Sequence, residues 1–223
     1  VTVNQTSQTA VLNWQAFSIS QDASVVYVQP NSSSVALNRV VGPDTSIILG
    51  SLSANGKLFL INPSGIVFAQ GANVNVGGLV ASTLDLSDAD FNVTIDTGAV
   101  NALVQNSGLL LADGGQVLMT AQAAGALLRT VVNNTGVVQA RSLASRDGRI
   151  MLLGDMQSGT ANVGGTLDAS APNGGDGGFI ETSAASVRVA DTAQVTTAAP
   201  AGVSGTWLID PADFIVGSGG NIS

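Results

Sequence analysis

The feature that most constrains this chain is a recurrence of short Asn- and Gly-containing segments at a spacing of 28 residues. The three copies are Asn106–Leu109, Asn134–Val137 and Asn162–Gly165. Each copy leads into a short strand-like run, and an Asp-Gly step with a second such run follows. These steps begin at Asp113, Asp147 and Asp176. A strand–turn–strand unit with a period in the high twenties is typical of a β-solenoid coil.

Simple physics explains why such a chain stacks its coils. Strands of successive coils lie about 4.8 Å apart, and small aliphatic side chains fill the narrow interior. Corners need Gly and Asn because these residues tolerate left-handed backbone. A β-sandwich is the alternative all-β fold. It would not produce the 28-residue recurrence together with an aromatic content of only 4%. The sequence therefore predicts an all-β solenoid.

The composition excludes several classes of function. The 223 residues contain no Cys and no His, which removes thiolate nucleophiles, His-based triads and Cys–His metal sites. The net charge of −8 argues against a nucleic-acid partner. No run approaches the 18 apolar residues of a membrane-spanning helix. We expect no enzyme activity, no cofactor, no metal and no integral membrane segment, and we expect a monomer.

The chain divides into three parts by regularity. Residues 1–105 are less regular and richer in aromatic side chains, and we interpret them as a cap followed by the first coils, with Trp14 and Phe17 as the core of the cap. Residues 106–205 are predicted to form regular coils. Residues 206–223 are Gly- and Ser-rich at their end, and are interpreted as a linker or the start of a further region.

Six segments, in order along the chain, resemble the two-partner secretion domain (haemagglutination activity domain). This domain opens filamentous-haemagglutinin-like and high-molecular-weight-adhesin-like exoproteins of Gram-negative bacteria. The segments are Ala10–Ile19, Pro30–Val40, Asn55–Ile66, Gly77–Asp85, Gly177–Ser183 and Gly205–Pro211. The chain differs from the family pattern at Ser64, where Asn is usual. It also starts almost at the Asn13-Trp14 segment, so we expect the first cap strands to be missing.

The resemblance implies a right-handed parallel β-helix with an N-terminal cap and extra-helical β-strands, and residues 1–205 would be the secretion domain. It also implies a role as the secretion address of a large exoprotein, an adhesin being our expectation. The expected partner is an outer-membrane transporter of the Omp85 type, whose POTRA domains recognise the address in the periplasm. The exoprotein would then fold at the cell surface or be secreted, and the full-length passenger would contact a host glycan or protein.

Two segments are candidate sites for transporter recognition. Asn62-Pro63-Ser64-Gly65-Ile66 has the chemistry of a tight turn, because Pro63 fixes φ and Gly65 tolerates positive φ. A turn and a secretion determinant are both open interpretations of this motif. Asn31, Asn38 and Arg39 belong to the other segment, where Arg39 either holds the cap down or contacts the partner.

A carbohydrate-binding or carbohydrate-degrading β-helix is the alternative function. Its candidate residues are Asp85, Asp88 and Asp90, since inverting glycosidases need two carboxylates about 6.5–9.5 Å apart. Nothing in the sequence distinguishes the pKa of one of these carboxyl groups from another.

Overall fold

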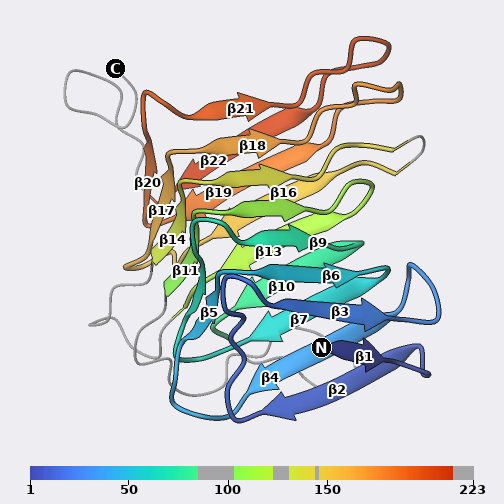
Figure 1. Cartoon of the computed structure of the whole chain (residues 1–223). Coiled ribbons are helices and arrows are strands. Elements are labelled where there is room, and N and C mark those ends of the chain that lie inside the picture. Colours follow the sequence, from blue (N-terminus) through green and yellow to red (C-terminus); the bar gives the residue numbers. More distant parts are fainter. Residues whose placement is uncertain (85–102, 123–130, 144–145, 213–223) are drawn as a thin grey trace.

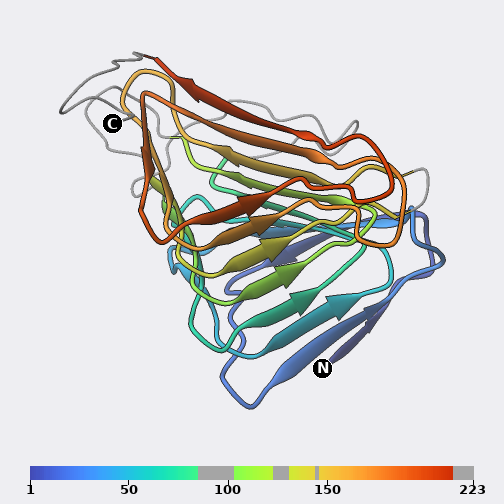
Figure 2. The same cartoon turned by 90° about the horizontal axis from the view of Figure 1, so that it is seen from above.

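A computed structural model describes residues 1–84, 103–122, 131–143 and 146–212. Every strand in these ranges belongs to one of three parallel sheets, and no helix occurs among the described residues. The chain visits the three sheets in turn and returns one layer further along (Figure 1). Seen from above, the sheets form three sides of a coil (Figure 2). The predicted parallel β-helix is confirmed.

Two sheets contain eight strands each. Sheet A runs in the order β1 (Thr2–Asn4), β3 (Ser24–Val28), β6 (Ser51–Ala54), β9 (Asn73–Asn75), β12 (Leu109–Leu111), β15 (Val137–Gln139), β18 (Thr166–Asp168) and β21 (Gln194–Thr196). Sheet B runs in the order β2 (Thr9–Trp14), β4 (Val35–Val40), β7 (Lys57–Ile61), β10 (Gly78–Ser82), β13 (Gln116–Thr120), β16 (Arg149–Leu153), β19 (Phe179–Ala184) and β22 (Thr206–Pro211).

Sheet C completes the coil with six strands. Its order is β5 (Ser46–Ile48), β8 (Ile66–Phe68), β11 (Leu103–Asn106), β14 (Val131–Asn134), β17 (Thr160–Val163) and β20 (Ser186–Val189). A parallel bridge from Ile19 to Ile48 extends this side into the first coil, and an antiparallel bridge between Leu143 and Arg146 lies outside the three sheets. Strand β22 pairs with β19, so sheet B continues past residue 205; the domain boundary there remains a prediction.

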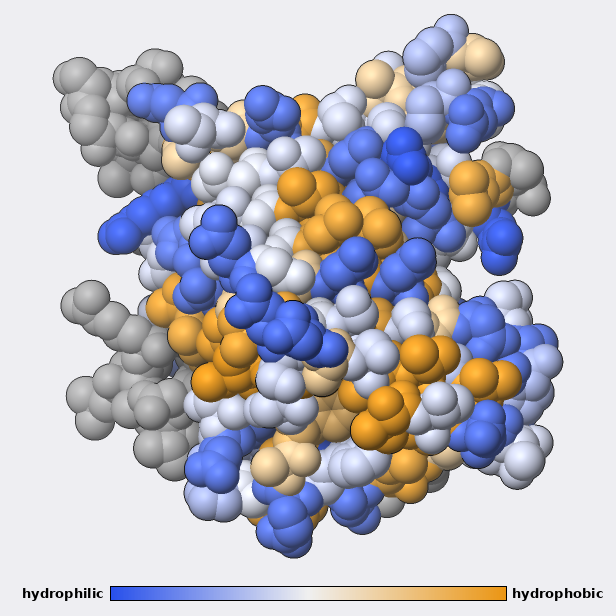
Figure 3. Space-filling model, viewed as in Figure 1, coloured by the Kyte–Doolittle hydropathy of each residue, from blue (hydrophilic) through white to orange (hydrophobic). Residues whose placement is uncertain are grey.

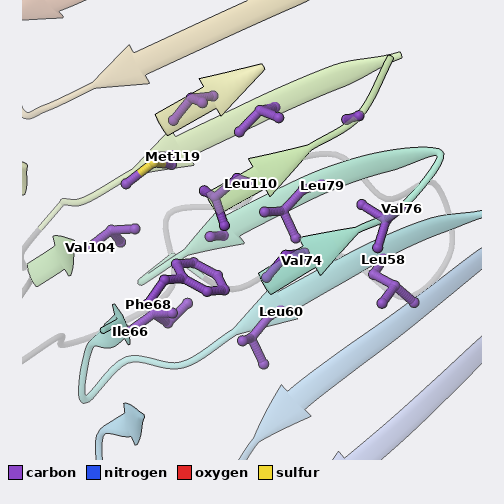
Figure 4. Close-up of a cluster of buried hydrophobic side chains, with 14 of the residues drawn as sticks. Leu58, Leu60, Ile66, Phe68, Val74, Val76, Leu79, Val104, Leu110 and Met119 are labelled. Carbon is purple, nitrogen blue, oxygen red and sulfur yellow. The ribbon is translucent and has the colours of Figure 1, made fainter. Parts of the chain in front are cut away.

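The core consists of aliphatic rows that run along the stack. In sheet B, Leu58, Leu79 and Val117 face inward at equivalent positions of successive coils and are buried. Figure 4 shows such side chains converging on the interior from all three sheets. Alternate residues of each strand point to opposite faces. The short aliphatic composition follows from this geometry, because every inward row must fit the same narrow bore.

The third copy of the predicted repeat is displaced by one residue. Asn106 pairs with Asn134 as the 28-residue spacing predicts, but Asn134 pairs with Val163 rather than Asn162. Asn162 is therefore on the outward side of β17, and Val163 occupies the buried inward position. The buried polar ladder of the corner, in which Asn106 Nδ2 donates to Asn134 Oδ1 at 2.9 Å, ends at the second Asn.

Candidate functional site

The segment from Asn62 to Ile66 forms the turn between β7 and β8. The Gly65 N–H donates to the Asn62 carbonyl oxygen at 3.0 Å, and the Ser64 N–H donates to Asn62 Oδ1 at 2.8 Å. Gly65 has a φ of 104°, a conformation that L side chains rarely adopt. Pro63 and Ser64 are partly exposed, whereas Ile66 is buried at the start of β8. The motif therefore has the turn geometry that its residues favour.

The Asn62 side chain also fastens this turn to the preceding coil. Its Nδ2 donates to the Asp44 carbonyl oxygen and to Ser46 Oγ, each at 2.9 Å. The Thr45 hydroxyl donates to the Ser64 carbonyl oxygen at 2.7 Å. Asn62 is 0% exposed. In the folded domain its amide is occupied by internal hydrogen bonds and is inaccessible to a partner.

Asn31 lies on the surface, in the turn that precedes β4. Its side chain exchanges two hydrogen bonds with the Gln8 amide, at 2.9 and 3.2 Å, and its Oδ1 accepts the Ser33 N–H at 2.9 Å. Asn31 is exposed, and Ser32 and Ser33 beside it are exposed as well. This part of the candidate site is open to solvent in the folded domain.

Asn38 is buried in β4 and organises the first coils. Its Oδ1 accepts hydrogen bonds from the Trp14 indole, at 3.0 Å, and from the Tyr27 hydroxyl. Burial raises the pKa of Tyr27, and the hydrogen bond to Asn38 offsets this only in part. The Trp14 ring meets Phe17 edge to face, with centroids 5.6 Å apart. Phe17 is buried, and Trp14 is partly buried against the main core.

Arg39 is partly exposed on the outward side of the same strand. It pairs in register with Asn13 and Ile61, so it lies beside the residue that immediately precedes Asn62. The structure thus brings Arg39 next to the Asn62 turn, at one end of β4. Asn31 lies beyond the opposite end of β4, so the predicted residues do not form a single compact site.

A second apolar cluster outside the main core was not identified from the sequence. Leu37 and Ile61 are both fully buried on the outward side of sheet B, with Phe59 packed against them. An apolar residue at every position of Lys57–Ile61 after the first is the signal that both faces of β7 are covered, as in other strands buried on two sides. Ile61 of this cluster is the register partner of Arg39, so the cluster adjoins Arg39 on the outward side of sheet B.

An ion pair joins two coils at the corner after sheet A. Asp113 Oδ2 accepts from Arg141 Nη2 at 3.0 Å and from Gln139 Nε2 at 2.9 Å, and Asp113 Oδ1 accepts the Arg141 N–H at 2.9 Å. Burial alone would raise the pKa of Asp113, but the hydrogen bonds from Arg141 and Gln139 outweigh it and lower that pKa. Asp85, Asp88 and Asp90, the candidate carboxylates of a carbohydrate-degrading site, lie outside the described residues.

Comparisons with known proteins match the N-terminal part of the chain to one family. Residues 1–101 match the family described as TPS secretion domain, TPS standing for two-partner secretion. The heme/hemopexin-binding protein of Haemophilus influenzae is 48% identical over 86 residues, and its counterpart from the Rd strain is 46% identical over 86 residues. These segments cover 39% of this chain but only 9% and 10% of the two relatives. The chain thus matches about a tenth of the length of these curated relatives.

A solved structure agrees over a larger part of the chain. The crystal structure of the HMW1 secretion domain from Haemophilus influenzae superposes with a TM-score of 0.54 and 25% sequence identity. The superposition covers 84% of this chain and 65% of that structure. The resemblance drawn from the sequence segments is confirmed, and the family concerned is one of secretion domains rather than of enzymes.

Proposed function

We propose that this chain, whose residues 1–101 match the TPS secretion domain family, is the secretion address of a large Gram-negative exoprotein. A dedicated outer-membrane transporter of the Omp85 type recognises it in the periplasm through POTRA domains. The exoprotein then crosses the outer membrane and reaches the cell surface or the medium. The passenger that follows the address acts as an adhesin.

The burial of Asn62 supports recognition before the domain folds. Its amide is 0% exposed and is held by the Asp44 carbonyl and the Ser46 hydroxyl, so a transporter can contact it only while the coils are apart. Asn31, in contrast, is exposed in the folded domain. We therefore assign the Asn62–Ile66 motif a double role, as a contact of the unfolded chain and as a turn of the folded one.

The parallel stack supports a role for folding in export. Strand β4 hydrogen-bonds to β2 on one side and to β7 on the other, and the same one-layer advance continues to β22. Each emerging coil can therefore dock on the edge of the coil before it and bury its apolar row. Folding outside the cell draws the remaining chain forward, and the first coils provide the edge on which this begins.

A secretion assay tests the proposal. The exoprotein is expressed with and without its transporter, and again after deletion of residues 1–101, and its amount in the medium and on the cell surface is measured. We expect export to require both the transporter and residues 1–101. Export that continues at the same level after either is removed would refute the proposal.

A further inference from the structure

A groove on the outward side of sheet B carries an unusual share of the positive charge of this chain. Its first part is a hollow of about 370 Å³ whose lining includes Lys57, Arg146 and Arg149, with Asp147 as the carboxylate among them. The whole chain has only seven Lys and Arg residues against fifteen Asp and Glu. Three cations beside one carboxylate make this groove positive on a molecule with a net charge of −8.

A second hollow continues the groove toward the end of the stack. It has a volume of about 410 Å³, shares Asp147 and Arg149 with the first, and reaches Phe179 and Thr206. The Arg149 guanidinium lies over the Phe179 ring, 5.4 Å from its centroid, which holds the charge at the junction of the two hollows. From β7 to β22 there are five strand-to-strand steps, a length of about 24 Å at the usual strand spacing.

Gly78 lies on the floor of this groove, and the packing of the backbone does not require a glycine at this position. In sheet B it lies between Lys57 of the previous coil and the outward-facing Gln116 of the next coil. A Cβ on Gly78 would meet Lys57 Cγ at 3.3 Å, a flexible side-chain atom. A Cβ on the neighbouring Gly77 or on Gly115 would instead lie 3.0 or 2.1 Å from a carbonyl oxygen of the previous coil. Backbone packing thus accounts for Gly77 and Gly115, whereas the missing side chain at 78 leaves space in the groove.

The cations of the groove are not committed to internal ion pairs. Within the part of the chain that the structure describes, Arg141 is paired with Asp113, whereas no ion pair involves Lys57, Arg146 or Arg149. An elongated, hollowed and positive surface of this kind fits a linear anionic ligand. On the face of the molecule that Figure 3 shows, hydrophobic side chains form small patches separated by hydrophilic ones.

We propose that this groove binds a linear acidic polysaccharide, whose carboxylate or sulfate groups pair with Lys57, Arg146 and Arg149 and whose hydroxyl groups bind Ser32, Ser33 and Gln116. A polypeptide fits less well, because the strands under the groove already use their backbone hydrogen bonds within sheet B and offer no free edge. A nucleic acid duplex fits less well because it carries one phosphate per about 1.7 Å of its length, and the three cations of the groove would leave most of these phosphates unpaired. This binding is independent of the transporter-recognition role.

Binding of defined oligosaccharides to the purified 223-residue chain tests the proposal. The probes are a hexameric oligogalacturonate, which carries only carboxylates, a heparin hexasaccharide, which also carries sulfates, and neutral maltohexaose, measured by calorimetry. We expect saturable binding of at least one acidic probe, weakened by added salt, and none of maltohexaose. The stronger acidic probe identifies which anionic group the groove prefers.

Matched variants locate the binding. The pair of substitutions Lys57→Gln and Arg149→Gln should weaken it by about tenfold or more, the loss expected for two charge-assisted hydrogen bonds. Gly78→Leu should block the groove without removing charge. Arg188→Gln, an exposed cation of β20 in sheet C, is the control and should leave binding unchanged. Circular dichroism establishes that each variant is folded.

The proposal is overturned if the folded chain binds neither acidic probe, or if Arg188→Gln weakens binding as much as the groove variants. Tighter binding of poly-glutamate than of either oligosaccharide would also overturn it, in favour of an acidic peptide. None of these measurements involves the transporter, so they can fail while the secretion role stands.

Discussion

Replacing Asn62 by Ala should reduce the stability of the folded domain substantially. The substitution removes three hydrogen bonds: two donated by Nδ2, to the Asp44 carbonyl and Ser46 Oγ, and one accepted by Oδ1 from the Ser64 N–H. At a net value of about 1 kcal/mol each, the free energy of unfolding should fall by about 3 kcal/mol. The buried Ser46 hydroxyl left without this donor adds to the loss.

Urea unfolding followed by tryptophan fluorescence measures this change. Trp14 lies in β2 and Trp207 in β22, so the two indoles report on opposite ends of the stack. Ser64→Ala is the matched control, because the turn uses the backbone of Ser64 and its side chain is partly exposed. We expect the control to stay within about 0.5 kcal/mol of the original chain, as surface substitutions usually do.

The reasoning is refuted if Asn62→Ala lowers the free energy of unfolding by less than about 1 kcal/mol, the value of a single hydrogen bond. It is also refuted if Ser64→Ala costs as much as Asn62→Ala. The motif would then owe its sequence to something other than holding the coil together, and its role in export would have to be explained without the fold.

Three further predictions concern other parts of the stack. Trp14→Ala removes the edge-to-face contact with Phe17 and the hydrogen bond to Asn38. Because Trp14 is only partly buried, we expect the free energy of unfolding to fall by about 3 kcal/mol, the lower end of the range for replacing a core aromatic residue by Ala. Thermal unfolding measures this change, and an unchanged Tm would contradict the prediction. Because the pKa of Asp113 is lowered in the folded chain, the stability it contributes is present above its usual pKa of 3.8 and is lost as the pH falls through the lowered value. Urea unfolding across this range should therefore show a decline that Arg141→Gln makes smaller, and an unchanged decline would argue against the pair. Gly115→Ala should abolish or severely weaken folding, whereas Gly78→Ala should leave a β-rich circular dichroism spectrum; equal effects would refute the account of the groove floor.

The sequence predicted the coil but not its full register. The Asn-x-Gly recurrence identified the corner correctly at Asn106 and Asn134, because these side chains pair in the structure. The third copy was placed one residue early, at Asn162 instead of Val163. In a strand, a shift of one residue exchanges the inward and outward faces, and the lengths of the connecting segments decide the register without any motif to show it.

The candidate site was predictable only as far as local chemistry reaches. Pro63 and Gly65 indicate a turn by themselves, and the structure has one there. That Asn62 is anchored to Asp44 and Ser46 depends on which coil lies beneath, and so does the bond from Trp14 to Asn38. These three contacts join residues 16 to 24 positions apart, a separation at which no local pattern specifies the partner.

The positive groove was likewise outside the reach of sequence reasoning. Lys57 comes from one coil and Arg146 and Arg149 from another, and they line the same hollow only because β7, β10, β13 and β16 are successive neighbours in sheet B. The sequence does show that cations are scarce, with seven Lys and Arg residues in the whole chain. Because they are so few, three of them lining one hollow is a notable concentration of positive charge.

The measurement that tests the central claim most directly is a titration of this chain against the POTRA domains of the proposed outer-membrane transporter. The chain is presented once folded and once in urea just sufficient to keep it unfolded, with Asn62→Ala measured in the unfolded form. We predict saturable binding that is tighter for the unfolded chain and weakened by Asn62→Ala. Absence of binding in both forms would contradict the assignment of this chain as the secretion address.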